Sequence, residues 1–413
     1  MRVADQTPNR LVRFSDPESA ALSSSRRLGV VALGVFFWAS HLPVTTVRAV
    51  LMGGCIAVAI ALVPALMSSQ AMASLAMTGL FCGLVIVSRL LSPPQTDYAA
   101  SKTTLLIIAL LIGMFIAPLI VHSEVAFERF VTYLVYGATA LAAAALIIGA
   151  SRQGRLAPWG LNPAILGRLI GVGALYAIVR YIEGRGTRGT MAVGAICSIG
   201  VIGVASRTSV LALGAVALLL LYFDKSTRRI GRATFLGAAS ALGLSLGFAF
   251  ASAGALERFS LTQFTLAQHR TEGNRLDVYE VALRSIVQEP LGVGVGNFSS
   301  LHRFILAPHN LLLEFAVELG WVAALVLMAT WFRANRVACG LARANRERLL
   351  VAVFWYQSAA MFLGGEATLP AVLFYIPLSV LALFRRTPRQ QLSGSNSDPR
   401  IRGKLRARRP LVT

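Results

Sequence analysis

The chain has 413 residues, of which 56% are hydrophobic and 14% charged, and its mean hydropathy is +0.67. A soluble domain of this length would carry about 25% charged residues, so the composition excludes an ordinary soluble globular protein. The apolar runs are continuous rather than alternating, which excludes a β-barrel, and backbone groups inside lipid must be paired, which makes each run a helix. We therefore predict an all-α polytopic membrane protein.

The net charge of +21 does not indicate a nucleic-acid partner, because of where the charge lies. Lysine and arginine gather in the short loops and tails between apolar runs, as the positive-inside rule describes. Cys55, Cys82, Cys197 and Cys339 form neither a disulfide framework nor a metal-binding spacing. The first residues lack the apolar core of a signal peptide, so we expect the first span to direct insertion.

The apolar runs predict about twelve membrane spans, since one span needs about 20 apolar residues. Their expected bounds are 28–46, 49–67, 71–91, 104–121, 130–150, 164–182, 190–206, 208–223, 233–255, 309–332, 350–365 and 367–384. This organisation gives an N-terminal tail at 1–27, nine spans within 28–255, one large loop at 256–308, three spans within 309–384 and a basic tail at 385–413.

The arginines predict the orientation of these spans. If the spans alternate, Arg26-Arg27, the loop Lys225–Arg232, the loop Arg333–Arg348 and the tail from Arg385 all fall on one side. Basic loops mark the cytoplasmic side. Both termini are therefore predicted in the cytoplasm, and the 256–308 loop on the periplasmic side.

The large loop is expected to carry an amphipathic helix that begins after Asn274 and ends before Pro290. Such a helix can lie on the outer leaflet of the membrane. The glycines that follow, at 292, 294 and 296, fit either a turn that cradles phosphate or a flexible return to the membrane. The apolar stripe of the helix is formed by Leu276, Tyr279, Leu283 and Ile286.

Three side chains on the predicted periplasmic side are candidates for chemistry. His309 stands at the entrance of a span, where the positive end of the helix dipole favours the neutral imidazole that a general base requires. Arg207 lies between two spans and Arg275 starts the loop helix, and arginine binds phosphate bidentately. Alternatively, His309 is an ordinary residue of the membrane interface, and the Arg207 side chain extends to the lipid headgroups. Arg168 and Arg180, near the ends of the predicted span 164–182, are likewise expected to extend to the headgroups.

Two carboxylates follow His309 in the same span. Glu314 and Glu318 are four residues apart and therefore share one helix face. They are expected to orient His309 or bind sugar hydroxyls, or else to pair with an arginine of a neighbouring helix. Carboxylates within membrane spans are rare and costly, so a role for both is expected.

The spacing of these residues resembles the O-antigen ligase/polymerase family of the bacterial envelope. In the ligase pattern, His-Asn is followed by nine residues, a glycine and, three positions later, a small or aromatic residue. This chain has Gly320 at the glycine position and then Ala323, where ligases usually have Gly, Thr or Tyr. The resemblance covers roughly residues 200–330 and depends on Ser206-Arg207, Asn274-Arg275, Pro290-Leu291-Gly292-Val293-Gly294, His309-Asn310 and Glu318-Leu319-Gly320.

The resemblance implies a GT-C-like fold and a metal-independent glycosyltransferase without a cofactor, in the bacterial inner (plasma) membrane. The donor would be a glycan on undecaprenyl diphosphate, and the acceptor a glycan or lipid A-core. The outer segments carry no Asp-x-Asp motif for a metal, so arginines would balance the diphosphate charge. The implied roles are a catalytic base for His309, donor-diphosphate binding for Arg207, Arg275 and Arg270, and support for Asn310, Glu314 and Glu318.

Three other functions stay open from the sequence. A polymerase of the same family would transfer the growing glycan to another lipid-linked repeat and would share these motifs. A polysaccharide transporter or flippase would place its charged residues near the bilayer midplane rather than at one face. A scaffolding membrane protein would leave the polar residues of the loop unexplained as a set.

Overall fold

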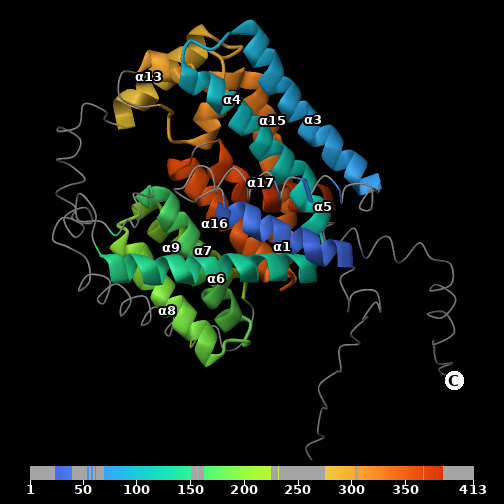
Figure 1. Ribbon diagram of the computed structural model, residues 1–413, viewed down its shortest axis with the longest axis vertical. Coiled ribbons are helices and arrows are strands. Elements are labelled where there is room, and N and C mark those ends of the chain that lie inside the picture. The colour runs from blue at the N-terminus through green and yellow to red at the C-terminus, as the bar shows by residue number, and fades with distance from the viewer. Residues whose placement is uncertain are drawn as a thin grey trace, which may run out of the picture.

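The computed structural model describes residues 24–39, 54, 57–58, 61, 69–149, 156, 162–224, 231, 275–302, 306–365 and 367–384. Every regular element within these residues is a helix (Figure 1). The prediction of an all-α fold is therefore confirmed for the described residues, whereas the predicted spans 49–67 and 233–255 lie largely outside them. Five helices are long and apolar enough to cross a membrane: 71–91, 97–121, 124–148, 163–182 and 311–343.

The helices form two groups with α16 (Arg348–Gly364) and α17 (Val372–Ser379) between them (Figure 1). The first group contains α1 (Ser24–Ala39), α6 (Glu124–Ile148), α7 (Pro163–Ile182), α8 (Arg188–Gly203) and α9 (Arg207–Phe223). The second contains α3 (Ser69–Leu91), α4 (Asp97–Leu110), α13 (Arg275–Gln288) and α15 (Leu311–Arg343). The shorter elements are η2 (Leu111–Ile116), α5 (Ala117–Val121), α14 (Phe298–Leu301), η4 (Leu369–Ala371) and η5 (Val380–Phe384).

Polar side chains explain where several of these helices begin. The first backbone N–H groups of a helix have no hydrogen-bond acceptor within the helix. In an apolar bundle, water does not supply one either. Each of five capping side chains accepts a hydrogen bond from a backbone N–H in the first turn. These caps are Thr96, Ser123, Asn162, Thr187 and Asn310.

Helix α15 is longer than the sequence predicts. Residues 333–343, expected in a basic loop, continue the helix, and its 33 residues would measure about 50 Å if straight. Gly320 divides it, because φ 85° and ψ 177° are not helical. The stretch after Gly320 is about 35 Å long, close to the membrane core of about 30 Å. Arg333 lies within this stretch and donates to Ala382 O at 2.6 Å, which explains how the helix accommodates its charge.

The break at Gly320 is filled by the loop that follows α13. In a regular helix, Trp321 N–H would donate to Val317 O. Here Trp321 N–H donates to Pro290 O at 3.0 Å, and Val317 O accepts from Val293 N–H at 2.8 Å. The loop thus supplies the backbone partners that the broken helix lacks.

The same loop and α3 bind the next carbonyl of α15. Glu318 O accepts from Gly294 N–H at 3.2 Å and from the Ser88 hydroxyl at 2.8 Å. A Cβ on Gly292 would lie 2.6 Å from Glu318 O, and Gly292 has φ 91°, so no other residue fits there without rearrangement. Gly292 and Gly294 allow the loop to pack directly on the α15 backbone. The structure shows them neither in a phosphate-cradling turn nor in a flexible return to the membrane.

Asn297 joins this loop to the turn between α3 and α4. Its side-chain amide donates to Pro93 O and Val293 O, both at 2.9 Å, and its carbonyl oxygen accepts from Gln95 N–H at 2.9 Å. The side chain is buried, and its hydrogen bonds are made to backbone groups. The start of α4 is thereby fixed relative to the break in α15.

Helix α13 is present as predicted, but it packs with a different face. Val278, Ala282 and Ile286 are buried against α15. Leu283, assigned to the apolar stripe, is 55% exposed because the helix packs through the neighbouring positions. The stripe prediction is therefore wrong for Leu283 and holds for Ile286.

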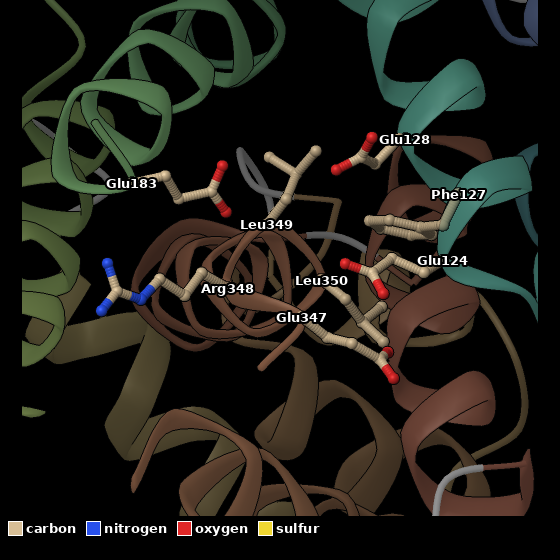
Figure 2. Close-up of a pocket in the computed structure, with 8 residues that line it drawn as sticks. All are labelled: Glu124, Phe127, Glu128, Glu183, Glu347, Arg348, Leu349 and Leu350. Atoms are coloured by element: carbon tan, nitrogen blue, oxygen red, sulfur yellow. The ribbon is translucent and has the colours of Figure 1, made fainter. Parts of the chain in front are cut away.

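The two ends of α16 lie in different surroundings. At its start, Arg348 reaches Ile182 O at 3.2 Å and Asp224 Oδ1 at 3.3 Å, which joins the ends of α7 and α9. We call this the Arg348 end. A pocket there is lined by Glu124, Phe127, Glu128, Glu183, Glu347, Arg348, Leu349 and Leu350 (Figure 2).

Arg180 also belongs to the Arg348 end and not to the headgroups. Its guanidinium lies 3.1 Å from Glu128 Oε1 and 3.0 Å from Glu183 Oε2, and its side chain is 11% exposed. The prediction that Arg180 extends to the lipid headgroups is wrong, because two carboxylates of the protein hold it.

Replacing Gly320 with alanine is expected to destabilise the fold by at least about 2 kcal/mol, because φ 85° is strained for alanine and the new Cβ would lie 2.6 Å from Leu291 C. The measurement is the midpoint of thermal denaturation of the detergent-solubilised protein. The matched control is Gly83→Ala in α3, where nothing lies within 4 Å of the added Cβ. Equal midpoints for the two variants would show that the break in α15 does not depend on glycine.

Candidate functional site

His309 lies two residues before the first residue of α15 and has an unusual backbone conformation. Its φ is 53°, in the left-handed region that non-glycine residues rarely adopt, and its side chain is exposed. Such strain costs on the order of 1–3 kcal/mol and persists only where the surrounding structure imposes it. The conformation presents the imidazole at the first turn of α15 instead of adding it to the helix.

Asn310 is the residue that imposes this arrangement. Its side-chain oxygen accepts from Leu312 N–H at 3.0 Å and from Leu313 N–H at 3.1 Å, which caps α15. Its side-chain amide donates to Phe362 O at 2.7 Å, near the end of α16. Asn310 therefore fixes the start of α15 to α16, and the position of His309 follows.

Arg207 begins α9 in a similar setting. Ala205, two residues before it, also has φ 53°, and Arg207 is half-buried. The next residue, Thr208, packs on α16: its hydroxyl would lie 3.3 Å from a Cβ built on Gly364. Arg207 is thus held at the end of α16, as His309 is.

These contacts bring Arg207 and His309 to the same end of the bundle. The neighbour of each contacts α16 at positions two residues apart, Phe362 and Gly364. We call this the His309 end; it lies roughly 25 Å along α16 from Arg348. The prediction that Arg207 and His309 lie on one face is consistent with this geometry.

The start of α7 joins the same end. A Cβ on Gly167 would lie 2.3 Å from Ser206 Cβ, so α7 and the start of α9 are in direct contact. Arg168 follows Gly167, is 7% exposed, and directs Nη1 to Met361 Sδ at 3.1 Å and Nε to Ala164 O at 3.3 Å. The prediction that Arg168 extends to the headgroups is therefore wrong.

The electrostatics of the His309 end favour an anion. The starts of α7, α9 and α15 meet there, and each helix start carries a partial positive charge. Arg207 adds a full positive charge. Together, the helix starts and the arginine can stabilise a phosphate-bearing group.

The side chains of two predicted donor-binding arginines, Arg275 and Arg270, lie outside the described part of the structure. Arg275 is the first residue of α13, and only its backbone is described. Arg270 lies outside the described residues, as does Asn274. The structure therefore brings together Arg207, His309 and Asn310, and the roles of Arg275 and Arg270 stay predictions.

Glu314 and Glu318 share a partner that sequence reasoning missed. Lys102 Nζ of α4 lies 2.6 Å from Glu314 Oε1 and 2.7 Å from Glu318 Oε1, and none of the three side chains is more than 2% exposed. Glu314 Oε2 also accepts from Ala367 N–H at 3.0 Å. Of the predicted alternatives, pairing with a cation of a neighbouring helix holds, but the cation is a lysine and not an arginine.

A signal for Lys102 exists in the sequence. It is one of only three lysines in the chain and stands next to a long apolar run, where an isolated cation needs an acidic partner. The predicted span 104–121 began seven residues after the start of α4 at Asp97, and it therefore left out Lys102. Removing one member of such a buried pair costs about 3–5 kcal/mol.

Comparison with protein families identifies part of the chain. Residues 192–328, about a third of its length, match the family model described as O-Antigen ligase. This segment is similar to the O-antigen ligase family. A search of the curated proteins finds no match.

The O-antigen ligase segment contains most of the candidate residues. Arg207, Arg270, Arg275, His309 and both glutamates lie within 192–328. Lys102 and α16, which hold the start of α15, lie outside it. The matched segment and the apolar helices support an integral membrane protein with a ligase- or polymerase-like role in glycan processing.

Replacing Asn310 with alanine is expected to destabilise the protein by about 2 kcal/mol, because the helix cap is worth about 1 kcal/mol and the bond to Phe362 O is lost as well. The loss of stability is measured by thermal denaturation of the detergent-solubilised protein. Asn162→Ala is the control, since Asn162 caps α7 through Ala164 N–H and is exposed. If Asn310→Ala lowers the stability no more than Asn162→Ala does, the hydrogen bond from Asn310 to Phe362 O contributes nothing to stability.

Proposed function

We propose that the chain is a membrane glycosyltransferase that moves a glycan from undecaprenyl diphosphate to an acceptor sugar hydroxyl on the periplasmic side, as an O-antigen ligase does. The observation that carries the proposal is that Arg207 and His309 lie at the same end of α16. Both residues belong to the segment that matches the ligase family. A polymerase remains the alternative within the same family and uses the same chemistry.

The proposed reaction needs a base and a positive site. The acceptor hydroxyl oxygen attacks the anomeric carbon of the donor glycan, and the bond from that carbon to the diphosphate oxygen breaks. His309 accepts the hydroxyl proton as the new glycosidic bond forms. Undecaprenyl diphosphate leaves with the electron pair of the broken bond.

Arg207 and Arg275, with Arg270 as a further candidate, stabilise the charge that develops on the diphosphate. Their guanidinium groups stay charged throughout, and the helix starts of the His309 end add to the field. The donor bond is already activated, so the reaction consumes no nucleotide. With arginines in this electrostatic role, the proposed enzyme is metal-independent.

The arrangement of the helix ends supports the sidedness of the proposal. α7, α9 and α15 begin at the His309 end, where α16 stops, and α16 begins at the Arg348 end, where α7 and α9 stop. Alternating spans predict this segregation. The basic loops of the sequence then place the Arg348 end in the cytoplasm and the His309 end in the periplasm.

Each of His309→Ala, Arg207→Ala and Arg275→Ala is expected to lower glycan transfer by about 100-fold or more, because each removes a group that acts in the transition state. The measurement is the surface-glycan ladder on a gel, in cells that lack the native gene and carry each variant at matched membrane levels. Arg284→Ala is the control, since Arg284 is exposed on α13 and pairs with Glu280 of the same helix.

The accumulating precursor separates the two branches of the family. Long chains on undecaprenyl diphosphate indicate a ligase, and single repeats on undecaprenyl diphosphate indicate a polymerase. If all three variants restore a normal ladder, the proposed site is wrong, and a transporter becomes the better account.

A further inference from the structure

The ion cluster of Lys102, Glu314 and Glu318 is not part of the proposed reaction, yet both glutamates lie on α15, the helix that begins just after His309. The Lys102 ammonium lies 2.6 Å from Glu314 Oε1 and 2.7 Å from Glu318 Oε1, and all three side chains are buried. One carboxylate would suffice to neutralise one lysine. The second carboxylate therefore calls for an explanation other than charge balance.

The two carboxylates lie on a short, separately held piece of α15. This piece, residues 311–319, begins at the Asn310 cap and ends at the break at Gly320. Its start is fixed to α16 through Asn310, and its last carbonyls are bound by the loop after α13. Its middle is attached to α4 through Lys102. His309 is the residue directly before the Asn310 cap.

Two contacts to one ammonium restrict this piece more than a single contact does. A shift of α15 by one residue would move each carboxylate about 1.5 Å along the axis and turn it by about 100° away from α4. Lys102 can meet both glutamates in one register and one rotation only. An apolar contact of the same area would stabilise the fold equally well or better, but it would not select that register.

We propose that Lys102 is a positioning residue of the enzyme: by binding Glu314 and Glu318 it sets the register of residues 311–319 on α4, and so the place of His309. The inference rests on the proposed function for its effect on catalysis. Lys102 contacts no substrate in this account. Its loss displaces the base without removing it, so turnover falls while donor binding persists.

The test neutralises the cluster without leaving an unpaired charge, in the variant Lys102→Met with Glu314→Gln and Glu318→Gln. The matched control neutralises a second, half-buried cluster of one cation and two carboxylates, in Arg180→Met with Glu128→Gln and Glu183→Gln. Each full-length protein is reconstituted in liposomes with undecaprenyl-diphosphate-linked glycan and a glycolipid acceptor extract, and release of undecaprenyl diphosphate is followed against donor concentration.

The Lys102 variant is expected to lose about 10- to 100-fold in kcat, because a displacement of about 1 Å at a catalytic group has effects of this size. Its KM for the donor is expected to stay within about threefold of the wild-type value. The Arg180 control should keep both constants. A Lys102 variant with unchanged kcat would overturn the proposal.

A second readout does not depend on activity. Spin labels are placed at Ser101→Cys in α4 and His309→Cys, in a protein whose native cysteines are replaced, and the distance between the labels is measured by pulsed EPR. Ser101 and His309 are both exposed. Neutralising the Lys102 cluster should shift or broaden this distance distribution, and the Arg180 control should leave it unchanged.

The two readouts separate the two proposals. If wild-type protein releases no undecaprenyl diphosphate, the transferase function fails, and the EPR distances alone decide the role of Lys102. If the triple variant does not accumulate, Glu318→Gln replaces it, because the Lys102–Glu314 pair then remains neutral. Unchanged distances and unchanged kcat in Glu318→Gln would show that the second carboxylate does not position α15.

Discussion

The break of α15 at Gly320 is the constraint on which the rest of the site depends. A helix inside an apolar bundle cannot leave carbonyls unpaired, so a break must be matched by another backbone. The loop after α13 supplies that backbone through Pro290 and Val293, and Asn297 ties the loop to the turn before α4. The break therefore determines where α13, α3 and α4 lie, and it turns the first nine residues of α15 into a separate support for His309.

Buried cations in the bundle, like buried carbonyls, need a partner on a neighbouring element. At the Arg348 end, Arg180 and Arg348 bind carboxylates and a carbonyl on neighbouring helices, and in the interior Lys102 binds two glutamates. Each of these cations joins at least two helices. At the His309 end, the starts of α7, α9 and α15 gather with Arg207, and the first carboxylate of α15, Glu314, is bound by Lys102. The positive charge of the helix starts and of Arg207 favours the His309 end as the place where an external anion binds.

Sequence reasoning predicted the elements well and their contacts less well. Apolar runs, Pro290 and the His309-Asn310 pair located α13 and the start of α15, because local residue type decides where a helix begins and ends. The partners of Glu314, the buried face of α13 and the role of Gly292 depend on residues far away in the chain. A periodic pattern such as Leu276–Ile286 shows that a helix has an apolar side, but two helices that approach from different directions bury different positions.

The residues proposed to act and the residues that hold them come from different parts of the chain. The ligase segment at 192–328 contributes Arg207 and His309, whereas Lys102 and Phe362, which fix the start of α15, lie outside it. Ala205 and His309 both adopt left-handed backbone conformations, and such strain persists only under external contacts. The ligase segment alone therefore cannot place its own histidine, and the geometry of the site is a property of the whole bundle.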